Sequence, residues 1–335
     1  MMKLLVTFLL SIFLFSNSSS LSVNGTYQAR NYIVMDAYTN EVLEGKDIDQ
    51  SYSVASISKI MTAIIALESD KLFNVIIVDD IIKTIEGSSL YLSIGDQITI
   101  IDLVYGLLLR SGNDAAVLIA ENISGNIDSF VMEMNQKAKE IGMKNTIFNN
   151  PSGLDIFDEG NISSCYDMAL LMSYCFENEL FCQIINTETY KSPLKGAWIN
   201  KNKLLRQYEY CLGGKTGYTK KARRTLINCA EKDNQRLIVV TFNCGSDFSF
   251  HKYLFEKYFN DYNYIVFLNQ GKNYIDEFVI YSKKQIGIRI AKEKELRGVK
   301  KYYINPLTSQ LKITFIFDDG EIIDGGTYNN IQYSS

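Results

Sequence analysis

Three short blocks, far apart along the chain, carry side chains that together could cleave an amide through a covalent acyl intermediate. The first holds Ser56 and Lys59, the second holds Ser111 and Asn113, and the third is Lys215-Thr216-Gly217. A serine needs a base to become a nucleophile, and an amine three residues away can serve as that base. The second block adds a hydroxyl and an amide, and the third adds another cation beside a hydroxyl. Each block alone occurs by chance, but all three in this order predict acyl transfer by serine without histidine.

The only histidine of the chain, His251, supports lysine as the base. Most serine hydrolases use an imidazole as general base, but His251 lies in an aromatic run with no Gly-x-Ser-x-Gly motif nearby. We therefore interpret it as a packing residue. One histidine and no Cys-x-x-Cys pair are too few ligands for a zinc site, so no metal and no cofactor are expected.

Hydrophobic periodicity places the first block at the start of a helix. Ser56 to Glu68 repeats apolar side chains at helical spacing, which puts the serine in the first turn and Lys59 one turn later on the same face. The free N–H groups of a helix N-terminus can also stabilise a developing oxyanion. The alternative is a capping serine beside a solvated lysine. Upstream, Asn31 to Asp36 and Glu41 to Gly45 have the pattern of a β-hairpin.

The other two blocks fall at a turn between helices and in a β-rich stretch. Helices are predicted over Ile101 to Arg110 and over Ala115 to Glu121. The residues between them form either a turn that points two polar side chains into one cavity or an ordinary turn with an N-cap. The third block opens a stretch in which Arg224 to Ala230 and Arg236 to Asn243 resemble paired strands. Its glycines leave room for a ligand backbone along the strand edge, although an ordinary hairpin would have the same pattern.

Length and composition indicate a globular protein without a nucleic-acid partner. The chain has 335 residues, 47% of them hydrophobic and 21% charged, and a net charge of −4. Residues 1–20 have the charged, apolar and small-residue order of a signal peptide, with an uncleaved anchor as the alternative, so we expect the protein to act outside the cytoplasm. We expect one domain over 24–261 and a small β-rich accessory domain over 262–335.

The six cysteines all lie in the second half of the chain and lack the dense spacing of a disulfide framework. We expect mostly buried thiols and leave one or two bridges open. The C-terminal stretch from Asp318 to Ser335 is acidic and polar, unlike a basic amphipathic anchor, so peripheral association with a membrane is also left open.

At residues 30–260 the sequence resembles the D-alanyl-D-alanine carboxypeptidases, which are low-molecular-mass penicillin-binding proteins. Besides the three blocks, the resemblance rests on six segments: Tyr32 to Ala37, Glu86 to Leu92, Tyr105 to Ala116, Asn150 to Asp155, Tyr166 to Leu171 and Gly214 to Thr219. The resemblance implies an α+β fold, an antiparallel sheet flanked by helices as in the penicillin-binding and β-lactamase-like transpeptidases. The substrates it implies are peptidoglycan stem peptides, and β-lactam antibiotics would be covalent inhibitors.

The same resemblance implies a role for each site residue. Ser56 would be the nucleophile, Lys59 its general base and Ser111 a relay for protons. Asn113 would bind the substrate amide, Lys215 with Thr216 would hold the terminal carboxylate, and Gly217 would also belong to the substrate-binding site. The backbone N–H groups of Ser56 and Tyr218 would form the oxyanion hole. A β-lactamase and a penicillin-binding sensor that does not turn over are the alternatives, and Ser-Gly-Asn rather than Ser-Asp-Asn favours the carboxypeptidase.

Two positions depart from the pattern of the family. Arg223 stands where the family usually has glycine, and Phe248 follows Asp247 where the family often has arginine. One hypothesis is that Arg223 helps to bind the terminal carboxylate of the substrate in place of the missing arginine. The alternative is a solvated arginine in a hairpin, because exposed charges contribute little.

Overall fold

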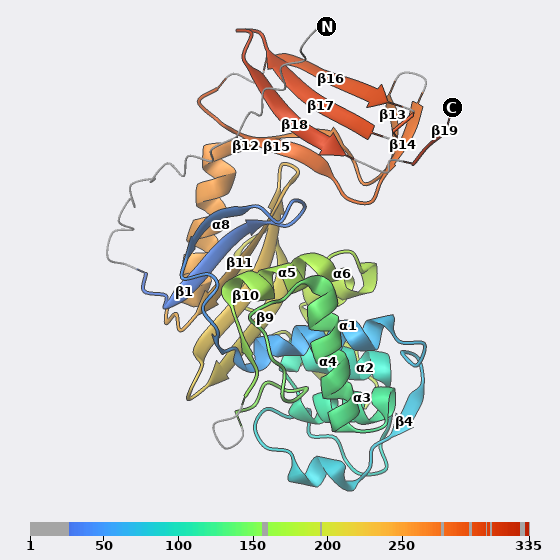
Figure 1. Ribbon diagram of the computed structural model, residues 1–335. Helices are drawn as coiled ribbons and strands as arrows, with labels where there is room; N and C mark the ends of the chain where they lie inside the picture. The colour runs from blue at the N-terminus through green and yellow to red at the C-terminus, as the bar shows by residue number, and fades with distance from the viewer. Residues whose placement is uncertain are drawn as a thin grey trace, which may run out of the picture.

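The central feature of the protein is a five-stranded antiparallel sheet (Figure 1). The computed structural model describes residues 27–334 apart from 156–159, 195, 276–277, 295–296, 306, 309 and 329–331. The predicted signal peptide, 1–20, lies outside the described residues. The strand order is β2 (Val42–Lys46), β1 (Asn31–Asp36), β11 (Gln235–Phe242), β10 (Arg223–Lys232) and β9 (Cys211–Thr219). The predicted hairpin is confirmed as β1 and β2, and β9, which carries the third block, is an edge strand.

Alternation of side chains along the strands gives the sheet two apolar faces. In β1, Ile33 and Met35 pack into the core beneath the helices, while Val34 packs against the other face. The helical side holds α1 (Lys59–Glu68), α2 (Ile100–Arg110), α3 (Asn113–Ser124), α4 (Ile127–Ile141), α5 (Cys165–Cys175) and α6 (Glu179–Asn186). The opposite face is covered by α8 (Asp247–Asp261), which contributes Phe250 and Leu254 to the second core. The expected α+β architecture is confirmed.

The predicted helix starts differ from the structure by a few residues. The first turn around Ser56 is a 3₁₀ helix, η1 (Ala55–Ser58), and regular α-helix begins only at Lys59. A tight 3₁₀ turn is common at helix N-termini, and here its backbone packs closely against neighbouring loops. Helix α3 begins at Asn113 rather than at Ala115, so the break after α2 is only Ser111 and Gly112.

Short elements connect the helices and complete the chain up to the third block. They are β3 (Tyr52–Ser53) paired with β6 (Ile162–Ser163), β4 (Val75–Ile77) paired with β5 (Gln97–Thr99), β7 (Thr189–Ser192) paired with β8 (Gly196–Ile199), η2 (Asp80–Thr84) and α7 (Leu204–Gln207). All six cysteines are free thiols, and five of them are buried. No described helix is long and apolar enough to cross a membrane.

The chain after α8 forms strands around a core of its own (Figure 1, orange and red). The three small sheets are β12 (Tyr262–Leu268) with β15 (Ile286–Ala291), β13 (Gly271–Ile275) with β14 (Phe278–Ser282) and β19 (Gln332–Ser334), and β16 (Gly298–Asn305) with β17 (Gln310–Phe317) and β18 (Ile322–Tyr328). This part lies at the end of the main sheet away from α1 to α4. A buried ion pair joins the two parts, because Arg289 Nη2 donates to Asp36 Oδ2 at 2.6 Å.

Candidate active site

The amine of Lys59 lies at the centre of the site. Its Nζ donates hydrogen bonds to Ser56 Oγ at 3.1 Å, to Asn113 Oδ1 at 2.7 Å, and to the carbonyl oxygen of Ser152. The lysine is fully buried, with an exposed fraction of 0%. A buried amine needs acceptors for its protons, and these three groups supply them. The structure therefore joins the first and second blocks around one nitrogen.

The third acceptor comes from a loop that the sequence analysis did not assign to the site. Gly153 follows Ser152 with φ of +75°, and a Cβ there would lie 2.1 Å from the carbonyl oxygen of Ala55. Only glycine permits this backbone and this close approach. Thr62 Oγ1 also donates to the Pro151 carbonyl at 2.7 Å, so the loop is held against the turn that carries Ser56. Its segment, Asn150 to Asp155, was part of the family resemblance, which was the available signal.

The second block is held in place by the chain segment that precedes α2. Asn113 Nδ2 donates to the Glu86 carbonyl at 2.6 Å, and its backbone N–H donates to the Ser88 carbonyl at 2.7 Å. Ser111 is buried, with φ of +65°, and ends α2 in the left-handed conformation. Among the described residues the Ser111 hydroxyl has no recorded hydrogen bond. The turn thus places the Asn113 amide on Lys59 and leaves Ser111 beside it in the chain without a direct bond to either catalytic candidate.

The third block lies directly against the turn of the first. A Cβ at Gly217 would be 3.0 Å from the backbone nitrogen of Ser56, so glycine at this position lets β9 lie close against the serine turn. Lys215 is buried and donates from Nζ to the Thr216 carbonyl at 2.7 Å. Tyr218 follows on the same edge strand with 60% of its side chain exposed. The structure therefore brings all three blocks together, as the sequence predicts.

The electrostatics of the site favour a neutral lysine. The pKa of Lys59 is lowered from 10.5 to about 7, chiefly by burial and also by the positive charge of Lys201, while Asp114 opposes the shift. Burial, Lys59 and Lys201 hold the pKa of Lys215 well below its usual value. The sequence analysis missed Lys201, whose Nζ donates to Ser88 Oγ at 3.2 Å from an exposed position. No sequence motif identifies Lys201, because it affects the pKa of Lys59 through its charge alone.

His251 is a packing residue, as expected. It is fully buried in α8 on the opposite face of the sheet, where its ring nitrogens meet Asn228 Nδ2 at 3.3 Å and Thr241 Oγ1 at 3.0 Å. Burial lowers its pKa to about 3, so the ring stays neutral. It cannot serve as base for Ser56 from that face. Among the described residues no group of three or more His, Cys, Asp or Glu side chains could hold a metal ion.

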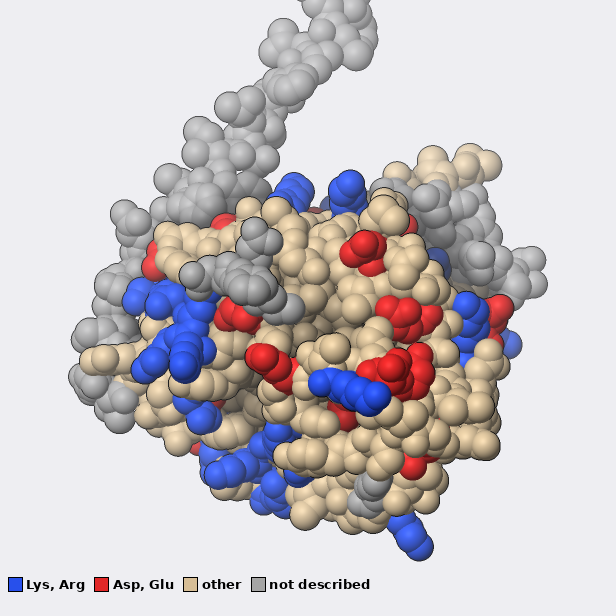
Figure 2. Space-filling view, turned by 90° about the horizontal axis from the view of Figure 1, so that it is seen from below, with Lys and Arg blue, Asp and Glu red and all other residues tan. Residues whose placement is uncertain are grey.

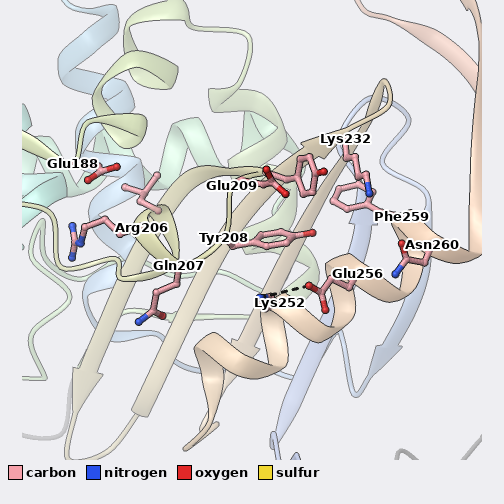
Figure 3. A pocket seen from close by; sticks show the side chains of 12 residues that line it. Glu188, Arg206, Gln207, Tyr208, Glu209, Lys232, Lys252, Glu256, Phe259 and Asn260 are labelled. Carbon is pink, nitrogen blue, oxygen red and sulfur yellow. Dashed lines mark ion pairs between the residues drawn. The ribbon is translucent and has the colours of Figure 1, made fainter.

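Two hollows differ in their relation to the site. A cavity of about 610 Å³ adjoins it, because Asn113 and Ser152 belong to its wall together with apolar side chains such as Ile85 and Leu154. A second hollow, between Tyr208 and the helix face of Lys252 and Glu256, includes none of the predicted site residues (Figure 3). Seen from below, basic and acidic side chains both occur on the surface, and neither sign covers the face alone (Figure 2).

Comparison with solved structures identifies the class of protein. The fold is that of the penicillin-binding enzymes. The crystal structure of penicillin binding protein 5 from Haemophilus influenzae matches with a TM-score of 0.76 and 25% identity, over 92% of this chain and 96% of that one. That of a D-alanyl-D-alanine carboxypeptidase from Mycobacterium tuberculosis H37Rv matches with a TM-score of 0.66 and 30% identity, over 69% of this chain and 91% of that one.

Sequence comparison identifies the family within that class. The profile described as D-alanyl-D-alanine carboxypeptidase matches residues 17–246. A D-alanyl-D-alanine carboxypeptidase of Bacillus subtilis (strain 168) is 36% identical over 267 residues, which are 73% of this chain and 67% of that protein. The chain belongs to the D-alanyl-D-alanine carboxypeptidase family. The family, fold and enzyme class predicted from the sequence are thus confirmed.

Proposed function

We propose that this carboxypeptidase removes the terminal D-alanine from peptidoglycan stem peptides through an acyl-enzyme on Ser56. The observation that carries the proposal is the fully buried Lys59 amine, 3.1 Å from Ser56 Oγ and with a pKa lowered to about 7. Such an amine is neutral in a large fraction of molecules at neutral pH, and only a neutral amine can accept the serine proton.

The reaction then proceeds in two halves. In the first, Lys59 takes the proton of the Ser56 hydroxyl while Oγ attacks the carbonyl carbon between the two D-alanines. The oxyanion is stabilised by the backbone N–H groups of Ser56 and Tyr218. Protonated Lys59, directly or through Ser111, returns the proton to the departing amine, and the C–N bond breaks. In the second half, a water molecule loses a proton to Lys59 while its oxygen attacks the carbonyl carbon of the ester. The bond between that carbon and Ser56 Oγ breaks, Lys59 returns the proton to Oγ, and the shortened peptide is released.

Substrate lies along the edge of β9. Gly217 lets the peptide and the strand approach the serine closely, and Asn113 binds the amide of the residue before the cleaved bond. Lys215 and Thr216 hold the terminal carboxylate. The adjoining cavity of about 610 Å³, with its apolar wall, accommodates residues further from the cleaved bond.

The expected setting is the cell envelope. A substrate in peptidoglycan requires an enzyme outside the cytoplasm, and the signal-peptide pattern of residues 1–20 supports this location. β-Lactam antibiotics would acylate Ser56 in the same way as the peptide. Peripheral contact with a membrane is compatible with this location and would be tested by sedimentation with vesicles.

The test is the mass of the protein after incubation with penicillin, together with product analysis. The wild type and Ser58→Ala should gain one penicilloyl group, because the Ser58 hydroxyl donates to the Ala55 carbonyl at 2.8 Å and accepts from Asn161 Nδ2 at 3.0 Å, which are structural contacts. Ser56→Ala should gain none, and an adduct on that variant would refute the assignment. Release of D-alanine from a D-alanyl-D-alanine peptide supports the carboxypeptidase. Rapid hydrolysis of a cephalosporin would instead indicate a β-lactamase, and a stable adduct without release would indicate a sensor.

A further inference from the structure

A guanidinium group lies beside Phe248, the residue that this chain has where the family often has arginine. It belongs to Arg224, whose Nε and Nη2 donate to the two carboxylate oxygens of Asp247 at 3.0 and 2.6 Å. The guanidinium carbon also lies 5.8 Å from the centre of the Phe248 ring. Two parallel hydrogen bonds to a buried carboxylate fix the orientation of an arginine.

The register of β9 and β10 brings this side chain toward the third block. Arg224 pairs with Tyr218, and Leu226 pairs with Thr216. Arg224 is therefore the diagonal neighbour of Thr216 on the same face of the sheet, and diagonal neighbours lie about 7–8 Å apart, within reach of a long side chain. Lys215 and Thr225 belong to the other face, because Thr225 Oγ1 bonds to the Val54 carbonyl beside the serine turn.

We propose that Arg224 is a substrate-binding residue for the terminal carboxylate, and this inference rests on the function proposed above. Thr216 lies on the edge strand, so a carboxylate bound to its hydroxyl sits at the open side of β9. Asp247 uses Nε and Nη2, and among the described residues no bond to Nη1 is recorded. The Arg224 side chain remains 45% exposed although its partner carboxylate is only 3% exposed. Nη1 thus provides donors for a second carboxylate, already oriented by the first.

The neighbouring Arg223 is less suited to this role. It pairs with Thr219, three residues beyond Thr216, which is about 10 Å along a strand. Its backbone has φ of +61° and its side chain is exposed, with no recorded hydrogen bond or ion pair to a described residue. The structure therefore favours Arg224 over Arg223 as the replacement for the missing arginine.

The test compares two substrates that differ only in the terminal carboxylate. We would measure kcat/KM of the purified enzyme for an acylated lysyl-D-alanyl-D-alanine peptide and for its C-terminal carboxamide. The wild type should prefer the carboxylate. Arg224→Gln should lose about 10- to 100-fold on the carboxylate peptide, the usual range for a hydrogen bond to a charged group, with little change on the carboxamide. Arg224→Lys should recover part of the loss, and Arg223→Gly should keep the preference of the wild type.

The ratio of the kcat/KM values for the two peptides distinguishes a loss of carboxylate binding from a structural effect. A variant that is only less well folded loses activity on both peptides equally. The inference would be overturned if Arg224→Gln kept the preference of the wild type for the carboxylate peptide. It would also be overturned if Arg223→Gly alone lost that preference. Failure of the proposed function would look different, because the wild type would then cleave neither peptide, whether or not penicillin forms an adduct on Ser56.

Discussion

The rate of acylation should fall toward acid pH as Lys59 becomes protonated. With a pKa of about 7, half of the amines are neutral at pH 7, and at pH 5 only about 1% are. Acylation by a β-lactam should therefore fall about 100-fold between its plateau and pH 5. An unperturbed lysine at pH 7 would be neutral in only about 0.03% of molecules, so the shift raises the available base about a thousandfold. The shift of the pKa corresponds to a free-energy penalty of about 5 kcal/mol for the charged form of Lys59.

The perturbation that tests the cause of the shift is Lys201→Gln. After burial, the positive charge of Lys201 is the largest effect that lowers the pKa of Lys59. Removing its charge should raise that pKa and move the acid limb to higher pH, so the variant acylates more slowly at pH 7 and reaches a similar plateau at higher pH. Lys203→Gln is the matched control, because Lys203 is an exposed lysine two residues away that is not among the causes of the shift.

The assay is the second-order rate of labelling by a fluorescent penicillin, measured from pH 5 to 9 for the wild type and both variants. Thermal denaturation at the same pH values shows that the proteins remain folded. A rate that stays flat from pH 5 to 8 would refute a lysine base. An acid limb that does not move in Lys201→Gln, or that moves equally in Lys203→Gln, would refute the electrostatic coupling.

Two further predictions concern stability. Arg223→Gly should stabilise the fold by up to about 1 kcal/mol, because φ of +61° costs a side-chain-bearing residue about 1–2 kcal/mol and glycine returns part of that as entropy. Urea unfolding measures this, and a clear loss of stability would contradict it. Arg289→Ala should destabilise by about 3 kcal/mol or more, because it leaves the buried Asp36 without its charged partner. The exposed pair of Lys312 and Asp324 is the control, and Lys312→Ala should cost less than about 1 kcal/mol. Equal effects of the two substitutions would contradict the role of the buried pair.

The local features of the site were readable from the sequence. Spacing of three residues puts Ser56 and Lys59 on one face of a helical turn, where their side chains can interact, and Nζ lies 3.1 Å from Oγ. The hairpin pattern likewise predicted β1 and β2, and the structure buries both faces of β1. The helix starts were less accurate, because the 3₁₀ turn at Ala55–Ser58 depends on a loop that packs against it.

The tertiary structure alone decided how the pKa of Lys59 is lowered and where the guanidinium group of Arg224 lies. Two of the acceptors of Lys59 come from residues 54 and 93 positions away, and their burial with the amine is what lowers its pKa. Lys201 acts through charge at a distance and has no pattern in the sequence. The choice between Arg223 and Arg224 depended on the register of two strands and on the start of α8. These properties arise from desolvation, charge and register between distant segments, which composition and local spacing do not encode.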